Sequence, residues 1–474
     1  MPTLTQKKQA KYKAARTKSL KSREANQCLG SENRYSATSV GIQSNFSFID
    51  LFAGIGGFRI ALEKLGGRCI ASSEIDRDAI AIYRENWPKD PQSHNLGNIC
   101  DIKDFHQVDL VVGGVPCQSW SIAGKNKGVQ DPRGRLWYEA IRVVENWAPK
   151  AFMFENVKGL TDPRHRDSLN YLLKSFSKLG YRVEYKLLNS YDFGIPQNRD
   201  RVFIVGIKEK LIKMPLKWPM PKSGHTYLSQ IVKDVEKSIK TPKEFVQRNL
   251  LGERINVGFN KLTPKGERNS FFYLTDIRNG PTSVHSWDLK DVSTREKQIC
   301  MVILKNRRKP IYGPCDGNPM SFWDIKKFVP DLRPGELEKL ATKKILREHA
   351  AGKYDFYNRR LSGGIDGVYR VYMPSSTFFS TLTASGTKDV VSLIDVAGET
   401  DWEYRENFIK EVLKPKKYRP LTPNEMARLQ GFPEGYKLHG KSIKNTKLFG
   451  NSVSVPVIAA VGEAIIATGC FEKV

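Results

Sequence analysis

The chain has 474 residues, 40% of them hydrophobic, and 77 Lys and Arg against 50 Asp and Glu give it a formal net charge of +27. This length allows two domains with a sizeable core, and the basic balance favours a polyanionic partner, nucleic acid first. Because no apolar run is long enough to span a bilayer, no signal peptide is visible and no basic amphipathic helix has an aromatic face, we expect a soluble cytoplasmic protein without a membrane partner.

The cysteines and histidines give no sign of a metal site or a disulfide framework. There are seven of each, no CxxC occurs, and no two histidines have metal-ligand spacing. We therefore expect no bound metal and no disulfides, as suits a reducing cytoplasm.

Residues 1–44 are polar and basic, with eight Lys or Arg between positions 7 and 23. This composition predicts a disordered or partly helical arm. Contact with DNA phosphates and a solvated tail without a role are both compatible with it.

From residue 46 onward, apolar runs of strand type alternate with amphipathic helical segments. We expect strands at 46–52, 69–74, 108–112, 151–154, 181–188 and 202–207. We expect helices at 58–65, 78–87, 136–147 and 169–179. Such alternation predicts an α/β fold with a doubly wound, mostly parallel sheet covered by helices on both faces.

The alternation stops after about residue 215, where Gly, Pro, aromatic and basic residues follow no clear period. This change predicts a second, smaller, irregular and partly β domain. Helical patterns return at 423–430 and 453–467, and we expect this last part to pack back onto the first domain. The predicted units are an arm (1–44), a first domain (45–214), a second domain (215–400) and a segment that completes the first domain (401–474).

A glycine-rich turn, FAGIGGF at 52–58, follows the first expected strand and lets backbone approach a ligand there. The turn lacks the GxGxxG pattern, so a dinucleotide is not specifically indicated. Glu74 ends the second strand, where an acid typically binds a ribose diol. An adenosyl cofactor such as S-adenosylmethionine fits both features, but tight packing without a ligand explains the turn equally well.

Cys117 follows another buried strand, on a Gly-Gly-Val-Pro turn that leads into a polar loop. A free cysteine is more often a small buried hydrophobe, and we accept that interpretation for Cys69 and Cys100. The turn and the loop favour a reactive thiol at position 117. A catalytic thiol needs nearby positive charge, which Arg199 and Arg201 could supply, although a surface basic pair is also common in so basic a chain.

Glu155 directly follows the expected strand at 151–154 and is a candidate general acid or hydrogen-bond partner. A capping or surface acid is the alternative. Glu74, Cys117, Glu155 and the arginine pair are all expected at one edge of one sheet, and this convergence carries more weight than any single residue.

These residues belong to stretches that resemble the DNA cytosine-5 methyltransferases over about 46–207 and 370–474. The matching stretches are FIDLFAGIGGFRIALEKLG (48–66), GGVPCQSWSIAG (113–124), MFENV (153–157), GIPQNRDRVFIVG (194–206), RPLTPNEMARLQGFP (419–433) and FGNSVSVPVI (449–458). The resemblance implies a Rossmann-like fold that binds S-adenosylmethionine, with a target-recognition domain in the middle of the chain.

The resemblance also implies roles for individual residues. Cys117 would attack C6 of a cytosine as a thiolate, and Glu155 would contact N3 and the exocyclic amine. Arg199 and Arg201 would steady the cytosine O2 and the thiolate. The implied cofactor pocket contains Phe52, Gly54, Gly56, Phe58, Glu74, Ile75, Asn98, Ile99, Pro116, Leu136, Asn451 and Val453.

One position departs from the family pattern. The family often has Gly-Asp-Ile where this chain has Gly97-Asn98-Ile99. The amide oxygen of Asn98 can still accept a hydrogen bond from the adenine amine, and Asp101 is a possible substitute.

The target cytosine of such an enzyme lies inside a duplex and must be flipped out, with the loop at 118–135 as the expected lid. Among the middle-domain arginines, guanine edges and phosphates are both suitable partners, and we favour phosphate for at least one of them. The expected DNA contacts are Gln118, Ser121, Gln197, Arg359, Arg360, Arg370 and Thr381.

The sequence therefore predicts a monomeric, nucleoid-associated DNA cytosine-5 methyltransferase, a restriction-modification partner or a solitary enzyme. The alternatives are a tRNA cytosine-5 methyltransferase of the same fold and an inactive nucleic-acid binder. The large middle domain favours duplex DNA over RNA, and the intact Cys117 and Glu155 argue against an inactive protein. An adenine amino-methyltransferase is disfavoured because no Asp/Asn-Pro-Pro-aromatic tetrad is present.

Overall fold

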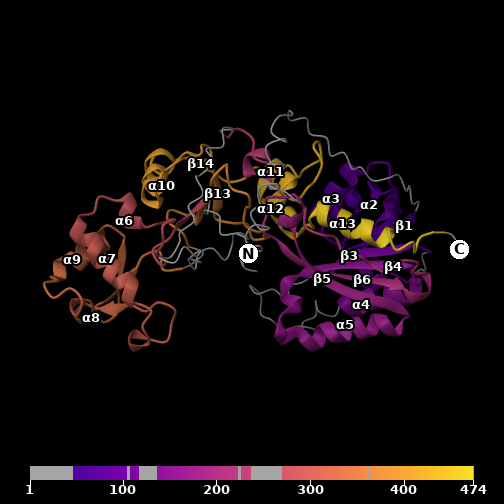
Figure 1. Ribbon diagram of the computed structural model, residues 1–474, viewed down its shortest axis with the longest axis horizontal. Coiled ribbons are helices and arrows are strands. Elements are labelled where there is room, and N and C mark those ends of the chain that lie inside the picture. The colour runs from indigo at the N-terminus through magenta and orange to yellow at the C-terminus, as the bar shows by residue number, and fades with distance from the viewer. Residues whose placement is uncertain are drawn as a thin grey trace, which may run out of the picture. The chain divides into compact units, whose positions relative to one another are not determined.

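The computed structural model describes residues 46–103, 107–116, 136–222, 226–235, 270–360 and 363–472 (Figure 1). The basic arm therefore lies outside the described residues, as do Cys117, Gln118 and Ser121. The described chain begins in the first strand of a six-stranded sheet.

The strand order of this sheet is β2-β1-β3-β4-β6-β5, and its strands are mostly parallel as predicted. Only β6 runs antiparallel to its neighbours β4 and β5. The start of β6 therefore lies beside the carboxyl end of β4, which explains how residues that precede a strand reach the ligand edge. The strands are β1 (Phe46–Leu51), β2 (Gly67–Ser73), β3 (Leu110–Gly114), β4 (Ala151–Val157), β5 (Tyr181–Asn189) and β6 (Asp200–Lys208).

Helices cover both faces of the sheet, as the alternating pattern predicted (Figure 1). Successive residues of a strand point to opposite faces, so Phe48 packs in one apolar cluster and Ile49 in the other. One face packs against α2 (Gly57–Glu63), α3 (Arg77–Asn86) and α13 (Val455–Ile466). The other packs against α4 (Leu136–Trp147) and α5 (Arg166–Lys178).

The middle of the chain forms two smaller sheets with helices, and the prediction of an irregular region missed these helices. A five-stranded sheet has the order β14-β13-β12-β7-β8, and a three-stranded sheet has the order β10-β11-β9. The strands are β7 (Phe271–Leu274), β8 (Ser283–Val284), β9 (Met320–Ser321), β10 (Leu346–His349), β11 (Lys353–Phe356), β12 (Arg370–Tyr372), β13 (Asp389–Ser392) and β14 (Tyr418–Arg419). The helices are α6 (Ser286–Leu289), α7 (Thr294–Asn306), α8 (Phe322–Lys326) and α9 (Pro334–Thr342).

Helix α10 (Asp401–Phe408), which continues into a π-helical turn at Ile409–Leu413, shares a core with β7 and β12. Its Phe408 stacks on Phe272 with ring centroids 3.9 Å apart. Residues just beyond position 400 thus pack with strands of the middle region, while the domain boundaries themselves stay a prediction.

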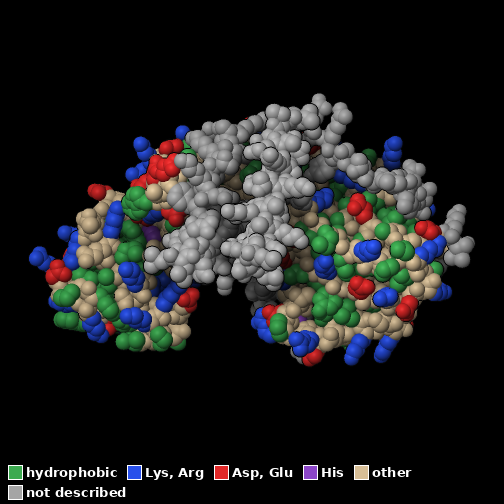
Figure 2. Space-filling model, in the orientation of Figure 1, with side chains coloured by type: hydrophobic (Ala, Val, Ile, Leu, Met, Phe, Trp, Pro, Cys, Tyr) green, Lys and Arg blue, Asp and Glu red, His purple; other side chains and the backbone are tan. Residues whose placement is uncertain are grey.

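The last helices are α11 (Pro423–Leu429), α12 (Ser442–Asn451) and α13. Of the described helical stretches, one, Ser442–Ile466, is long and apolar enough to cross a membrane by length and composition, but 67% of its apolar 18-residue window is buried inside the protein, as in a core helix. Lys and Arg side chains are spread over the face of the molecule shown in Figure 2, among fewer acidic ones.

Candidate active site

The turn between β1 and α2 has an unusual backbone. Phe52, Gly54 and Gly56 all have positive φ angles, of 56°, 55° and 79°. A Cβ on Gly56 would lie 2.4 Å from Trp87 Cη2, so packing excludes a side chain there. A Cβ on Gly54 would meet only the Phe52 carbonyl oxygen, at 4.0 Å, so the space beside this backbone is open. A strained residue next to an open glycine is typical of a ligand site.

Glu74 is held at this turn by backbone donors. Its Oε2 accepts a hydrogen bond from Gly54 N at 2.8 Å, and its Oε1 accepts from Ile75 N at 2.7 Å and Asp76 N at 2.8 Å. Asn95 fixes the Glu74 backbone, with its Oδ1 3.0 Å from Glu74 N and its Nδ2 3.1 Å from Glu74 O. An ionised carboxylate has about four acceptor sites, so this half-buried group keeps capacity for a ribose hydroxyl.

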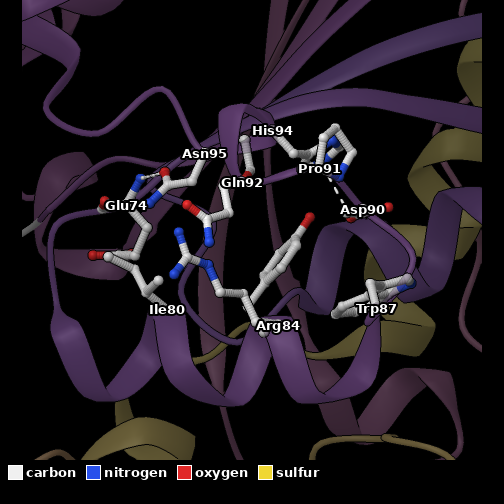
Figure 3. A pocket seen from close by; sticks show the side chains of 11 residues that line it. Glu74, Ile80, Arg84, Trp87, Asp90, Pro91, Gln92, His94 and Asn95 are labelled. Atoms are coloured by element: carbon white, nitrogen blue, oxygen red, sulfur yellow. Dashed lines mark hydrogen bonds and ion pairs between the residues drawn. The ribbon is translucent and has the colours of Figure 1, made fainter.

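A pocket adjoins Glu74 on the side of α3 (Figure 3). Asp90, His94 and Trp87 line this pocket and contact the buried Arg59, in an ionic cluster that the sequence did not predict. Arg59 donates to both carboxylate oxygens of Asp90, pairs with Glu63 at 2.6 Å and lies 4.5 Å from the Trp87 ring centroid. Cys69 contacts this cluster through His94, and burial raises the pKa of its thiol to about 12. An inert Cys69 agrees with the prediction, whereas Cys100, for which the same buried position was predicted, is exposed.

The residues expected around the adenine are differently exposed. Ile99 is 2% exposed, whereas Ile75 is 68% exposed. Asn98 is exposed, and its Oδ1 caps a short 3-10 helix (Ile99–Asp101) by accepting from Cys100 N at 3.1 Å. The amide oxygen of Asn98 is thus partly engaged by its own chain, while Asp101 is exposed.

Glu155 lies within β4, two residues before its end, so the prediction that it follows the strand is wrong. The carboxylate is 7% exposed, and its Oε1 lies 2.8 Å from Arg201 Nε. In the antiparallel register Glu155 faces Phe203 and Val157 faces Arg201, so Glu155 and Arg201 are diagonal neighbours on one face. The reversed direction of β6 therefore brings the two charges together.

Gly114 lies close both to Glu155 of this ion pair and to two of the expected cofactor residues, Phe58 and Val453. A Cβ on Gly114 would lie 3.8 Å from Glu155 Oε2, 3.8 Å from Val453 Cγ1 and 4.0 Å from Phe58 Cε2. These residues come from β3, β4, α2 and the segment before α13. The structure therefore brings Phe58, Val453 and Glu155 together at one point of the sheet edge.

Asn156 fixes the backbone that leads to Cys117, a role that the sequence did not predict. Its Nδ2 donates to Val115 O at 3.1 Å, and its Oδ1 accepts from Val157 N at 2.8 Å. The side chain is 1% exposed. The half-buried Pro116 follows, and Cys117 itself lies outside the described residues.

Arg199 is 2% exposed and donates to backbone carbonyls. Its Nη1 lies 3.0 Å from Leu382 O and 3.5 Å from Gly450 O, and its Nη2 donates to Ser452 O. Arg199 thus connects the segment after β12 with the end of α12. These contacts of Arg199 are to the protein backbone, and its contact with the reacting cytosine stays a prediction.

Gln197 is also committed to the protein. It is completely buried, and its Nε2 donates to Leu429 O at 2.7 Å. Such a position is at odds with the predicted contact between Gln197 and DNA. Thr381 is half-buried, with its Oγ1 2.5 Å from Asn198 O.

The remaining predicted residues are placed at the periphery. Arg359, Arg360 and Asn451 are exposed, and Leu136 is half-buried at the start of α4. Across the described ranges, no group of three or more His, Cys, Asp or Glu side chains could hold a metal ion.

The order of these elements and side chains matches a known family along most of the chain. The model of the family described as C-5 cytosine-specific DNA methylase matches residues 46–467. The chain belongs to this family. Like other C-5 cytosine-specific DNA methylases, it is a DNA (cytosine-5-)-methyltransferase that uses S-adenosylmethionine.

Curated relatives match over most of their length. The type II methyltransferase M.HgiBI of Herpetosiphon aurantiacus is 55% identical over 429 residues, which cover 90% of this chain and 98% of the relative. The type II methyltransferase M.BanI of Aneurinibacillus aneurinilyticus is 33% identical over 442 residues, 90% of this chain and 96% of the relative. Among solved structures, the methyltransferase EhMeth of Entamoeba histolytica is similar with a TM-score of 0.49 and 15% identity, over 89% of this chain and 98% of that one.

Proposed function

We propose that this methylase modifies cytosine C5 within one short sequence of double-stranded DNA and thereby protects that DNA from a cognate restriction endonuclease. The relatives at 55% and 33% identity are named type II methyltransferases, and the net charge of +27 suits a polyanionic duplex. We further propose that it acts as a monomer, in the cytoplasm and on the nucleoid, with the domain boundaries given by the sequence.

The proposed chemistry rests on the buried Glu155–Arg201 ion pair beside Val453 and Phe58. The Cys117 thiolate adds to C6 of the flipped cytosine, which raises the electron density at C5. The carboxyl of Glu155 contacts N3 and the exocyclic amine, where charge changes during this addition. Arg201 orients that carboxyl and contacts the cytosine O2. After methyl transfer, loss of the C5 proton allows the thiolate to leave C6.

S-adenosylmethionine supplies the methyl group when bound. Glu74 suits its ribose, and the open backbone at Gly54 suits a close approach. The exposed Ile75 is available to cover the adenine, with Ile99, Asn98, Pro116 and Leu136 as further contacts. Phe52 and Gly56 lie on the turn after β1, and Phe58 and Val453 lie beside Gly114 at the end of β3, which supports the rest of the proposed cofactor pocket, and Asn451 is included from the family motif alone.

The experiment that tests this function is bisulfite sequencing of a host without cytosine methylation. The host expresses either the intact chain or the Cys117→Ala variant. Methylated cytosines in one short motif, present only with the intact thiol, are the expected result. An unmethylated genome despite expressed protein would contradict the function, and labelled-methyl transfer to total RNA would then test the tRNA alternative.

A further inference from the structure

A second pocket, of about 350 Å³, lies where β12 and β13 meet the segment around Thr381. The strand residues Arg370 and Asp389 line it together with Asn198, Ser380, Thr381 and Thr383. Asn198 immediately precedes the buried Arg199. The chain therefore runs from this pocket directly into β6, whose first residues lie at the candidate active site.

Arg370 is held rigidly in this pocket. Its Nη1 donates to Asp389 Oδ2 at 3.2 Å, and the two residues are paired in the parallel register of β12 and β13. Its guanidinium carbon lies 4.8 Å from the Tyr369 ring centroid and 5.3 Å from that of Tyr273. The side chain is 22% exposed and lines the pocket.

Asp389 is in turn fixed by its own contacts. It is 4% exposed, and its Oδ2 also accepts from Ser380 Oγ at 2.5 Å. Its backbone N donates to Thr387 Oγ1 at 3.0 Å. A buried carboxylate with these contacts sets the plane in which the Arg370 guanidinium lies.

The ion pair with Asp389 distinguishes Arg370 from Arg359 and Arg360, the other two arginines expected to contact DNA. A guanidinium that is paired with a carboxylate adds little net charge, so it is a weak anchor for phosphate, but its oriented donors suit the fixed acceptors of a base. In contrast, Arg359 and Arg360 are exposed, and no acidic side chain of the described residues lies within 4.0 Å of either. Those two arginines suit phosphates.

We propose that Arg370, oriented by Asp389, reads the O6 and N7 acceptors of one guanine in the recognition sequence. Two acceptors side by side on the major-groove edge match the fork of a guanidinium. Asp389 is a positioning residue in this arrangement, because it acts through Arg370. The inference rests on the proposed methylation of a short duplex sequence.

The test replaces each guanine of the methylated sequence in turn by 7-deazaguanine, which lacks the N7 acceptor but keeps Watson–Crick pairing. We expect about a 10-fold loss of wild-type affinity at one guanine position. The Arg370→Ala variant should bind the natural duplex more weakly and show no further loss at that position. Asp389→Asn should reduce the 7-deazaguanine effect at the same position, and it should add nothing to Arg370→Ala.

Arg370→Lys keeps the positive charge but lacks the planar fork. This conservative variant separates the loss of the fork from a folding defect in Arg370→Ala. It should show a weaker 7-deazaguanine effect than the wild-type chain at that position, because an ammonium still donates but lacks the fixed fork, and a circular dichroism spectrum like that of the wild-type chain checks that the variant is folded. Arg359→Ala is the matched control, and it should weaken binding to all sequences alike and make the slope of log K against log salt shallower by about 1.

A uniform loss with the same change of slope in Arg370→Ala would show a phosphate contact and overturn the inference. Labelled-methyl transfer by the wild-type chain to the natural duplex is measured first. Failure of that reaction would contradict the proposed function rather than the role of Arg370.

Discussion

At the scale of single residues, the Glu155 carboxylate has a fixed orientation, because Glu155 is 7% exposed and its Oε1 lies 2.8 Å from the guanidinium of Arg201. Replacing Glu155 by Gln keeps the shape and one acceptor but removes the charge. We expect the single-turnover rate of methyl transfer to fall about 100-fold or more, with little change in cofactor affinity measured by calorimetry. Glu145→Gln, on the exposed side of α4, is the control. An equal loss of rate and affinity would indicate a structural role for Glu155.

Two aspartates, Asp50 in β1 and Asp109 directly before β3, should respond to pH in opposite directions. Burial raises the pKa of Asp50 well above its ordinary 3.8, and among the described residues neither carboxylate oxygen has a hydrogen-bond partner. The folded protein therefore keeps this proton where the unfolded chain has lost it. The stabilising contribution is complete below pH 3.8 and is lost as pH rises through the folded pKa. Asp50→Asn should therefore raise the free energy of unfolding increasingly above about pH 5, as urea titrations would show.

Asp109 supplies the contrast. Although burial opposes the shift, hydrogen bonds from Ser47 and the ammonium of Lys150 lower its pKa. Its stabilising contribution is present above pH 3.8 and is lost as pH falls through the folded pKa. Asp109→Asn should lower the free energy of unfolding at neutral pH. The same sign for both variants would contradict the assignment.

At the scale of elements, two adjacent glycines at the end of β3 have different neighbours. A Cβ on Gly113 would lie 2.6 Å from the carbonyl oxygen of Leu51 in the neighbouring β1, whereas a Cβ on Gly114 meets nothing closer than 3.8 Å. Gly113→Ala should therefore lower the free energy of unfolding by about 1–3 kcal/mol. Gly114→Ala should leave the free energy of unfolding nearly unchanged. Urea unfolding of the matched pair measures the difference, and equal stability of the two variants would contradict the close approach of β1 and β3.

Arg199 links elements that are far apart in the sequence. Its hydrogen bonds to Leu382 O and Gly450 O predict that Arg199→Lys lowers the free energy of unfolding by about 2–3 kcal/mol, because the planar fork is absent from lysine. The measurement is urea unfolding beside kcat and KM for DNA and cofactor. A loss of kcat at unchanged stability would instead place Arg199 on the reacting base.

The elements of the six-stranded sheet were predictable because period and turn chemistry define them locally. The bounds of α4 match the prediction, whereas β4 extends to Val157 and includes Glu155. Local pattern does not reveal strand direction, so the antiparallel β6 could not be predicted. The helices between residues 286 and 342 were missed because they bury short apolar faces in a small core without a clear period.

For the site, the residue types were predictable but their partners were not. Glu74 was singled out because an acid directly after a buried strand is a recognisable signal, whereas Glu155 was singled out near the end of a strand that proved to include it. Asn95, Asn156 and Asp389 act through hydrogen bonds to residues distant in sequence, which only the folded chain reveals. The backbone contacts of Gln197 and Arg199 could not be predicted, because a motif does not show whether a polar group faces a ligand or the protein backbone.

At the scale of the whole molecule, the net charge of +27 predicts DNA binding that weakens steeply with salt. We expect a chain without residues 1–44 to keep site-specific methylation, because the family match covers 46–467. Its slope of log K against log salt should become shallower by about 0.9 for each phosphate that the arm neutralises in the full chain. An unchanged slope, measured by fluorescence anisotropy, would show that the arm neutralises no phosphate.

The first and last parts of the described chain meet in one core. The rings of Phe46 and Phe471 stack with centroids 4.9 Å apart, and α13 packs on α2. A short peptide could therefore join position 472 to position 46 without disturbing the sheet, and the chain could be opened elsewhere on its surface. The fold then does not depend on which motif comes first in the sequence. We expect a circular permutant with the motifs in rotated order to fold to the same enzyme.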